Sequence, residues 1–274
     1  MIMITNNVFV ETNFPICNLG LVTTDKGIVI IDTPIRPTDA LKWRTEISKI
    51  GTLKYIINTE PHADHSRNSC FFDGVLVTHK ATRDRLEKAS LEEATEFVKK
   101  RDPEGLPLME DYKIRLADIA FEGDLTIYLG HHTFRLIHLP GHTAGNIGIY
   151  IPEERLVFVA DCVIYHGKSA LHEALPQLWL ESLQKLIGLD VDMIIPGHSA
   201  GTATCGKEYI KEQELIIKQW IEVVESAIKR GLTKEEAVKQ IVCPDPYPTL
   251  GLSPVSEAQL NKLIVNRIYD VLTK

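Results

Sequence analysis

The residues at 59–65, TEPHADH, gather side chains that bind metals or move protons. Two of them are carboxylates, Glu60 and Asp64, and two are imidazoles, His62 and His65. The preceding residues 55–58 form an apolar, β-branched run, which predicts a buried strand. The residues that follow, from 66 to 72, could begin a helix. Because open α/β sheets bind ligands beyond the ends of their strands, we expect a site on a loop at the end of this strand.

Three later clusters share this placement, since each lies where an apolar run ends. His142 lies in the sequence LPGHTAGN, Asp161 directly follows the run LVFVA, and His198 lies in IIPGHS. Ligand sites of open sheets lie at a common edge of strand ends, so we expect these side chains to converge on one site. Their mixture of imidazoles and carboxylates suits zinc, iron or manganese.

The elements that must position these residues form an α/β pattern. Short apolar runs broken by Gly, Pro and Asn predict strands, and longer stretches with apolar residues at i, i+3 and i+4 predict helices. The predicted strands cover residues 8–10, 17–23, 27–32, 55–58, 74–79, 125–129, 133–139, 146–151, 156–160 and 193–195. The predicted helices cover residues 38–50, 178–187, 207–230, 233–241 and 256–272. The strands fall into two blocks, each with helices, which is consistent with two similar α/β halves.

A charged segment at about 80–117 interrupts this alternation and predicts two or three surface helices and a loop. We favour a solvated face for it, and the functional alternative is a lid or a partner surface. We therefore predict one domain over residues 1–200 that contains this insertion. Residues 201–274 are expected to pack on that domain as a C-terminal helical extension. The apolar stripe of the helix at 207–230 is expected in the core, and a homodimer is left open.

Composition bears on the partners and the compartment. The chain has 274 residues and a formal net charge of −7, which argues against a nucleic-acid partner. No apolar run approaches the roughly 20 residues of a membrane span, and the first residues lack the basic region of a signal peptide. The five cysteines are an odd number with no close pair, so no disulfide framework or four-cysteine zinc site is expected. We expect a cytoplasmic protein with a small-molecule substrate and with no nucleic-acid or membrane partner.

In order and spacing, residues 13–199 resemble the metallo-β-lactamase superfamily of hydrolases, which includes glyoxalase II-like enzymes. The first family motif is H-x-H-x-D-H, and TEPHADH matches it at His62, Asp64 and His65; the PGHT and PGHS turns and Asp161 match later motifs. The resemblance implies a four-layer αββα sandwich with a metal site at one edge between two mixed sheets. It also implies two divalent metal ions, one held by His62 and His142, the other by Asp64, His65 and His198, with Asp161 bridging both.

The chemistry that the resemblance implies is hydrolysis by a hydroxide that bridges the two metals. The substrate would be a small-molecule ester, lactone, thioester, amide or activated ether. Asp64 would also have a catalytic role, orienting the nucleophile or accepting a proton. Two alternatives are a di-iron redox protein that handles oxygen or nitric oxide, and a metal-binding scaffold without activity.

Glu60 departs from the family pattern, because it stands where the first histidine of the motif is usual. One interpretation is that Glu60 is a ligand. The other is that it turns away or pairs with a basic residue. Zinc is the metal implied by the family, and a harder carboxylate donor would shift the preference toward iron or manganese or weaken the first metal site.

Several other residues have both a functional and a structural interpretation. Asp32 is expected either to support a metal ligand or to cap a turn. Cys162 is expected to be a small buried residue. Tyr165, His166, Lys168 and His172 are expected to bind substrate or to have ordinary surface roles, and no catalytic role is assigned to His79, His131, His132 and His138. Gly141, Gly145 and Gly197 are expected to allow tight turns.

Overall fold

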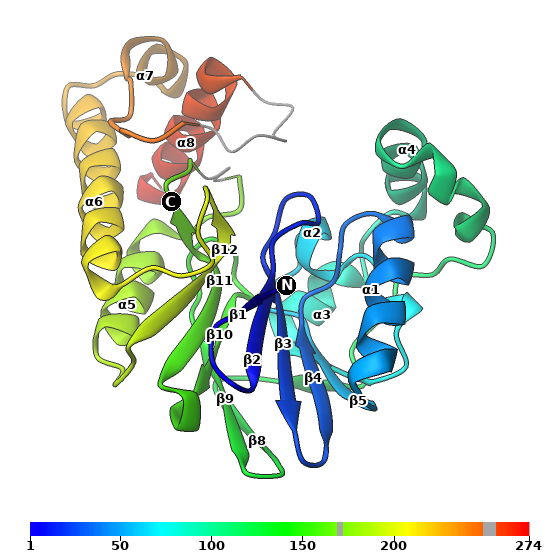
Figure 1. Cartoon of the computed structure of the whole chain (residues 1–274). Coiled ribbons are helices and arrows are strands. Elements are labelled where there is room, and N and C mark those ends of the chain that lie inside the picture. The colour runs from blue at the N-terminus through cyan, green and yellow to red at the C-terminus, as the bar shows by residue number, and fades with distance from the viewer. Residues whose placement is uncertain (169–171, 249–255, 274) are drawn as a thin grey trace.

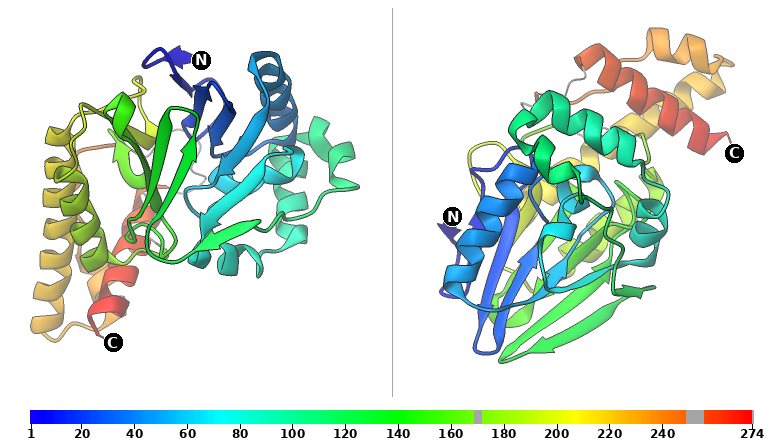
Figure 2. Two further views of the ribbon diagram at one scale, coloured as in Figure 1. Left: turned by 90° about the horizontal axis from the view of Figure 1, so that it is seen from below. Right: turned by 90° about the vertical axis from the view of Figure 1, so that its right-hand side faces the viewer.

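The computed structural model describes residues 1–168, 172–248 and 256–273. Two mixed β-sheets lie face to face, and helices cover the outer face of each, as Figure 1 and the turned views of Figure 2 show. The layers follow the order helix, sheet, sheet, helix. This architecture confirms the predicted α/β fold with a four-layer αββα sandwich and C-terminal helices. Within the described ranges, no helix is both long enough and apolar enough to cross a membrane.

The first sheet has seven strands in the order β1-β2-β3-β4-β5-β6-β7. These strands are β1 (Ile2–Met3), β2 (Val8–Glu11), β3 (Leu19–Thr24), β4 (Gly27–Ile31), β5 (Leu53–Ile57), β6 (Val75–His79) and β7 (Ile119–Phe121). Pairing is antiparallel from β1 to β4 and parallel from β4 to β7. The parallel half directs the ends of β4, β5 and β6 to the same edge, so the residues that follow these strands lie near one another.

The second sheet has five strands in the order β12-β11-β10-β9-β8. These strands are β8 (Leu125–Leu129), β9 (His132–His138), β10 (Ile147–Ile151), β11 (Leu156–Tyr165) and β12 (Met193–Ser199). Only the pairing of β11 with β12 is parallel among these strands. The two predicted strand blocks thus form two sheets of unequal size and different topology.

Several of the described helices begin at a local signal in the sequence. They are α1 (Pro37–Ile50), α2 (Ala63–Ser66), α3 (Lys80–Leu86), α4 (Leu91–Arg101), α5 (Pro176–Ile187), α6 (Lys207–Lys229), α7 (Lys234–Gln240) and α8 (Glu257–Leu272). Proline lies in the first turn of α1 and α5, where its missing N–H costs nothing. Thr233 and Glu236 form the predicted capping box at the start of α7.

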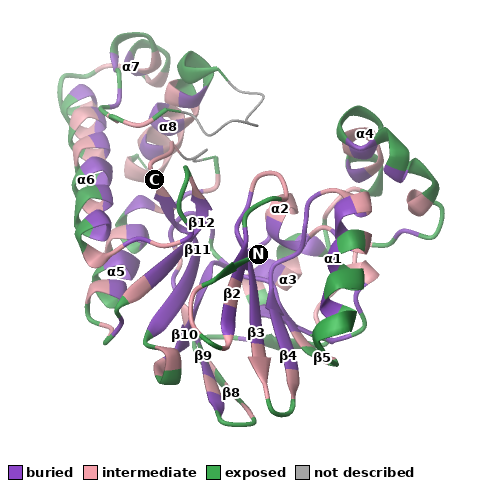
Figure 3. Cartoon of the chain, viewed as in Figure 1, coloured by how far each residue is buried: buried purple, intermediate pink, exposed green. Residues whose placement is uncertain are grey.

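Buried apolar residues fill three spaces between the layers, and Figure 3 shows how burial concentrates on the strands. Phe134 and Phe158 lie between the two sheets. Trp43 of α1 packs on the outer face of the first sheet. Trp179 of α5 and Trp220 of α6 pack on the outer face of the second. Each large apolar side chain buried in this way contributes roughly 1.5–3 kcal/mol, so the sandwich holds the site edge rigidly.

The C-terminal helices α6, α7 and α8 lie on the side of the second sheet (Figure 1). The predicted core stripe of α6 is confirmed, since Ile217, Trp220 and Val224 are buried. The predicted extension 201–274 includes residues 249–255 and 274, which lie outside the described residues.

In the insertion, α3, α4 and a 3₁₀ segment at Pro103–Met109 follow one another, and most of α4 is exposed on its outer side (Figure 3).

Some elements differ from the sequence prediction in ways that matter for the site. The TEPHADH residues are not on a plain loop, because α2 begins at Ala63, and only a 3₁₀ turn at Ser69–Phe71 stands where a helix over 66–72 was expected. β11 continues to Tyr165 and β12 to Ser199, so Asp161 and His198 lie within strands rather than after them. β1 and β7 were not predicted, because they are only two and three residues long.

Candidate metal centre

Four segments of the chain meet at the edge where the two sheets face each other. The residues after β5 and those of α2 come from the first sheet. The loop between β9 and β10, together with β11 and β12, comes from the second. All seven residues predicted as ligands fall into two groups whose donor atoms lie within 4.8 Å of one another within each group. The structure therefore brings together residues up to 138 positions apart in the sequence.

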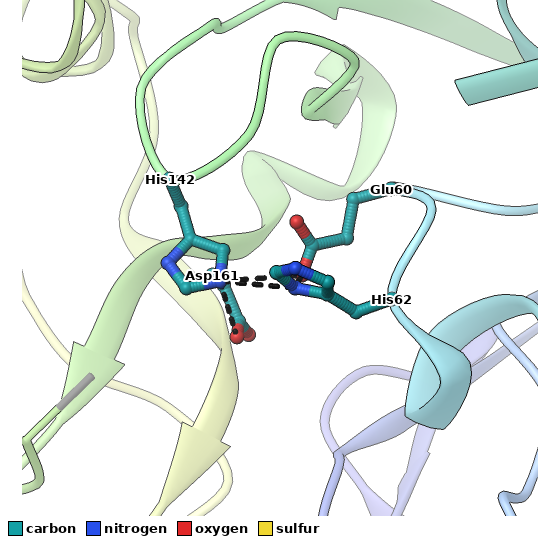
Figure 4. Close-up of side chains that lie close together, drawn as sticks. All are labelled: Glu60, His62, His142 and Asp161. Carbon is teal, nitrogen blue, oxygen red and sulfur yellow. Dashed lines mark hydrogen bonds and ion pairs between the residues drawn. The ribbon is translucent and has the colours of Figure 1, made fainter. Parts of the chain in front are cut away.

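The first group consists of Glu60, His62, His142 and Asp161, which Figure 4 shows pointing toward one another. His62 Nδ1 lies 3.2 Å from Glu60 Oε1 and 3.1 Å from His142 Nε2. His142 Nε2 lies 3.4 Å from Asp161 Oδ2. Four donor atoms thus face a common point.

Glu60 does not turn out to solvent. Its side chain is fully buried, its Oε1 faces the imidazoles, and its Oε2 accepts a hydrogen bond of 3.0 Å from Thr143 Oγ1. The carboxylate therefore occupies the place of a donor in the first group, with one oxygen directed inward and the other fixed by the Thr143 hydroxyl.

The second group consists of Asp64, His65 and His198. His198 Nε2 lies 3.3 Å from Asp64 Oδ2. Asp161 again takes part, since its Oδ1 lies 3.1 Å from His198 Nε2 and 3.3 Å from His65 Nε2. The two oxygens of the Asp161 carboxylate therefore face different groups, Oδ2 the first and Oδ1 the second.

A local irregularity of β11 aims Asp161 at this position. Ala160 has a positive φ of 48°, and the pairing of β11 with β12 shifts register on both sides of it. Such bulges redirect a side chain next to an active site. Opposite, a Cβ on Gly197 would lie 2.1 Å from Asp161 Oδ1, so only glycine leaves room for the carboxylate.

The prediction that glycines allow tight turns holds for the PGHT loop and is wrong for Gly197. Gly141 and Gly145 lie in the bends and turn of residues 141–145, whereas Gly197 lies within β12. None of the three has a positive φ. Each is also required for close approach, because a Cβ on Gly141 would meet Trp179, one on Gly145 would meet Thr82 and one on Gly197 would meet Asp161.

A further shell of hydrogen bonds orients the imidazoles. Asp32 Oδ2 lies 2.8 Å from His65 Nδ1, and its two oxygens accept bonds from the Thr59 N–H and hydroxyl. His198 Nδ1 donates to the Ile16 carbonyl at 2.8 Å. Both contacts leave the Nε2 atoms facing the site, which is how metal-ligating histidines are usually held. Asp32 therefore supports His65, as one of its two interpretations expected.

The electrostatics of the site favour cations. Burial alone would raise the pKa of the Glu60 carboxyl, but His62 and His142 hold that pKa below its ordinary value. Burial alone would lower the pKa of His62, but Glu60 raises it to about 9. Burial alone would also lower the pKa of His198, but the charge of Asp161 raises it to about 10. The buried carboxylates thus create a strong negative potential where the donor atoms meet.

Three buried polar atoms also point to a metal. His62 Nε2, His65 Nε2 and Asp161 Oδ1 are buried and make no hydrogen bond of good geometry with any described residue. Buried polar atoms normally have a partner. Imidazole nitrogens and carboxylate oxygens at this spacing are the donors that zinc, iron and manganese take, so the residues present fit such ions.

Comparison with known proteins agrees with this geometry. Residues 12–198 match the sequence profile described as the metallo-beta-lactamase superfamily. The chain belongs to this superfamily. That finding confirms the resemblance found in the sequence and places the chain in a superfamily of metallo-hydrolases.

Individual relatives are more distant. A hydroxyacylglutathione hydrolase from Mesorhizobium japonicum is 30% identical over 158 residues, which are 58% of this chain and 57% of that protein. The 2,4-dinitroanisole O-demethylase subunit alpha from Nocardioides sp. is 27% identical over 185 residues, which are 64% of this chain and 50% of that protein. The chain thus spans about half the length of the curated relatives it matches.

Solved structures support the superfamily's fold in this chain. A metallo-beta-lactamase family protein from Thermus thermophilus is similar with a TM-score of 0.69 and 16% identity, over 97% of this chain and 94% of that one. The sec-alkylsulfatase Pisa1 from Pseudomonas sp. has a TM-score of 0.70 and 11% identity, over 98% of this chain and 49% of that one.

Of the remaining candidates from the sequence, His172 contacts a residue of the site. His172 lies against His62, with ring centroids 5.1 Å apart, whereas Tyr165 and His166 stack on each other 3.9 Å apart. Lys168 pairs with Glu257 of α8 at 3.2 Å. Cys162 is fully buried, as expected.

Sequence reasoning overlooked some residues that bear on the site. Thr143, which bonds Glu60, lies inside the PGHT motif and could have been found there. Trp179 packs edge-on against His142, with centroids 5.7 Å apart, and Glu173 lies near His62. Neither of the last two carries a local sequence signal, because both reach the site from a segment about 100 or more residues after His62.

Proposed function

We propose that the chain is a metal-dependent hydrolase of a small-molecule substrate, with an acyl thioester as the leading candidate for the bond. The observation that carries this proposal is the Asp161 carboxylate, which presents one oxygen to each donor group. The relatives named hydroxyacylglutathione hydrolase support the thioester.

The residues present would hold two divalent ions. Glu60, His62 and His142 would bind one ion, Asp64, His65 and His198 would bind the other, and Asp161 would contact both. Such ions, when bound, lower the pKa of water and polarise the bond to be cleaved. Zinc is the ion expected from the superfamily, and iron or manganese is favoured by the carboxylate of Glu60.

The side chains of this site prepare the reaction in three ways. Asp161 and Glu60 are buried, so the negative potential that attracts the ions is not screened by water. Asp32 holds His65 in one tautomer and orientation. Asp64 Oδ2 is fixed beside His198, which suits it to orient the attacking nucleophile or accept its proton.

A second candidate substrate is an activated aryl ether. It is supported by the match to the 2,4-dinitroanisole O-demethylase subunit, which covers a larger share of this chain than the thioesterase match does. Both reactions would use the same ions and the same Asp161, so the choice between them is a choice of substrate and not of site.

The test is a substrate panel with protein purified without chelators and supplied with zinc, iron(II) or manganese. Chromogenic thioesters, esters, lactones, amides and activated aryl methyl ethers would be compared. We expect turnover of a thioester, and loss of more than about 100-fold in Asp161→Ala and His142→Ala, beyond the usual cost of losing a supporting contact. His131→Ala changes an exposed histidine away from the site and serves as the matched control.

The outcomes separate the alternatives. Turnover that survives Asp161→Ala in a folded protein would place the activity elsewhere. No turnover with any loaded metal would reject the hydrolase. In that case, iron absorption bands with oxygen or nitric oxide reactivity would favour the di-iron redox protein, and their absence would favour the scaffold without activity.

A further inference from the structure

A third set of donor atoms, distinct from the first and second groups, lies beside them. His62, His172 and Glu173 each offer one nitrogen or oxygen atom, and these three atoms lie within 4.8 Å of one another. His172 is exposed and Glu173 is partly exposed. The set therefore lies where an ion can arrive from solvent, unlike Glu60 and His142, whose side chains are 0% and 3% exposed.

His62 is a member of both this set and the first group, and its imidazole has two nitrogens. Its Nδ1 faces Glu60 and His142 of the first group. Its Nε2 is buried and makes no hydrogen bond with any described residue. His172 lies over the ring of His62, with the two planes inclined by 34°. The nitrogen left over by the first group is thus the one available to a ligand shared with His172.

The backbone from Glu173 to Leu175 is held from two directions, so the chain that carries this carboxylate is fixed in place. The Leu175 N–H donates to the Gly141 carbonyl at 2.7 Å. Arg267 of α8 donates to the carbonyls of Glu173 and Ala174 at 3.2 and 2.5 Å. These bonds tie the segment to the loop that carries His142 and to the C-terminal helix.

The carboxylate of Glu173 has a competing partner. Arg85 Nε lies 3.0 Å from Glu173 Oε1, and their side chains are 50% and 29% exposed. An ion pair with this exposure contributes little, on the order of 0–1 kcal/mol, so a divalent cation can displace it. The displacement nevertheless weakens metal binding at Glu173 relative to the buried groups.

We propose that His62, His172 and Glu173 form a third divalent-metal site, weaker than the binuclear pair, whose occupation by zinc inhibits the enzyme. Two imidazoles and a carboxylate are a usual zinc donor set. On binding, the ion replaces the proton on His62 Nε2, which goes to solvent, and Arg85 leaves Glu173. His62 is 20% exposed and is the most open side chain of the first group. An ion on its outer side therefore obstructs the entry of substrate, which inhibits the enzyme.

The number of ions is measured first, by equilibrium dialysis of the full chain against rising Zn²⁺ with elemental analysis. We expect wild type to take up a third ion after the first two, and His172→Ala to stop at two. His166→Ala removes a nearby histidine outside the set and should still bind three. His172→Gln, which keeps the size of the side chain, guards against a folding defect, checked by circular dichroism.

Substitution of Arg85 provides a test in which the affinity for the third ion should rise instead of fall. Arg85→Gln frees Glu173 and should tighten the third ion by up to about fivefold, the most that an exposed ion pair contributes. Glu173→Gln removes a ligand charge and should weaken the third ion by about tenfold. A third ion that binds His172→Ala as tightly as wild type, or a wild type that binds only two, would overturn the site. Equal affinity in Glu173→Gln and wild type would remove Glu173 from it.

The inhibitory part of this inference rests on the proposed function, and the ion count does not. In wild type, turnover should fall as the third ion binds, and His172→Ala should keep its turnover over the same zinc range. A third ion lost in His172→Ala without any hydrolysis in wild type would reject the proposed function and leave the site standing. Turnover unaffected by a bound third ion would reject inhibition alone.

Discussion

At the scale of single residues, we expect Glu60 to set which metal the first group prefers. It is buried, faces His62 and His142, and replaces an imidazole with a harder oxygen donor. We predict that Glu60→His raises the share of zinc over iron and manganese in protein purified without chelators, measured by elemental analysis. The same ions in the same ratio in both proteins would mean that Glu60 does not select the metal.

Asp32 tests how far the support of a ligand matters. Asp32→Asn removes the charge that faces His65 Nδ1 at 2.8 Å while keeping the shape of the side chain. We expect metal affinity at the second group to fall by about 10–100-fold, measured by competition with a chromogenic chelator. Asp25→Asn, at an exposed aspartate in a distant turn, is the control. An unchanged metal affinity in Asp32→Asn would mean that Asp32 only caps its turn and does not support His65.

At the scale of elements, the irregular parallel pairing of β11 with β12 fixes the position of Asp161. We predict that Gly197→Ala lowers the free energy of unfolding by about 1–3 kcal/mol in urea, because its Cβ would lie 2.6 Å from the Ala160 carbonyl carbon. Metal binding should fall as well, since Asp161 must move. Gly188→Ala, where the nearest contact is an ordinary 3.4 Å, should change stability by less than about 1 kcal/mol. Equal effects of the two substitutions would contradict this account.

Element by element, the sequence predicted the fold well wherever local signals were strong. The capping box of α7, the core stripe of α6 and the buried strand before TEPHADH were all found. Periodicity could not show that β11 continues past Asp161, because the positive φ at Ala160 bends the strand at a residue with no turn signal. β1 and β7 were missed since two or three residues show no alternation.

The candidate site could be predicted only in part for a related reason. Ligands that follow family motifs were named and grouped through the resemblance to the superfamily. The place of Glu60 required the structure, which buries its carboxylate beside His62 and His142. Glu173 was not named from the sequence, and His172 was named only as a substrate-binding or surface residue. Neither follows a motif, so their place beside His62 required the structure.

At the scale of the whole molecule, the buried charges couple metal binding to stability. In metal-free protein, the raised pKa values of His62 and His198, about 9 and about 10, mean that the folded state holds these protons more tightly than the unfolded state. This contribution is complete below the ordinary pKa of about 6.5 and is lost as pH rises through 9 and 10. The lowered pKa values of Glu60 and Asp161 act in the other direction, so their contribution is lost as pH falls below about 4.

We therefore predict that metal-free protein loses stability between about pH 6.5 and 10, and that protein loaded with metal does not, because the imidazoles then hold ions instead of protons. Urea unfolding at several pH values, with and without metal, measures this difference. Metal at 100 times its dissociation constant should add about 2.7 kcal/mol at neutral pH. Parallel pH profiles for the two forms would show that these imidazoles do not govern stability.

The bonds from Arg267 to the segment of His172 and Glu173 have a consequence for biosynthesis. Every donor of the binuclear groups precedes residue 199, so a growing polypeptide exposes all of them well before α8 emerges from the ribosome. On the proposed scheme, the two principal ions would bind before Arg267 holds the outer segment. The proposed third site would be completed only after α8 has been synthesised, which would give the nascent protein an interval in which the inner ions enter without obstruction.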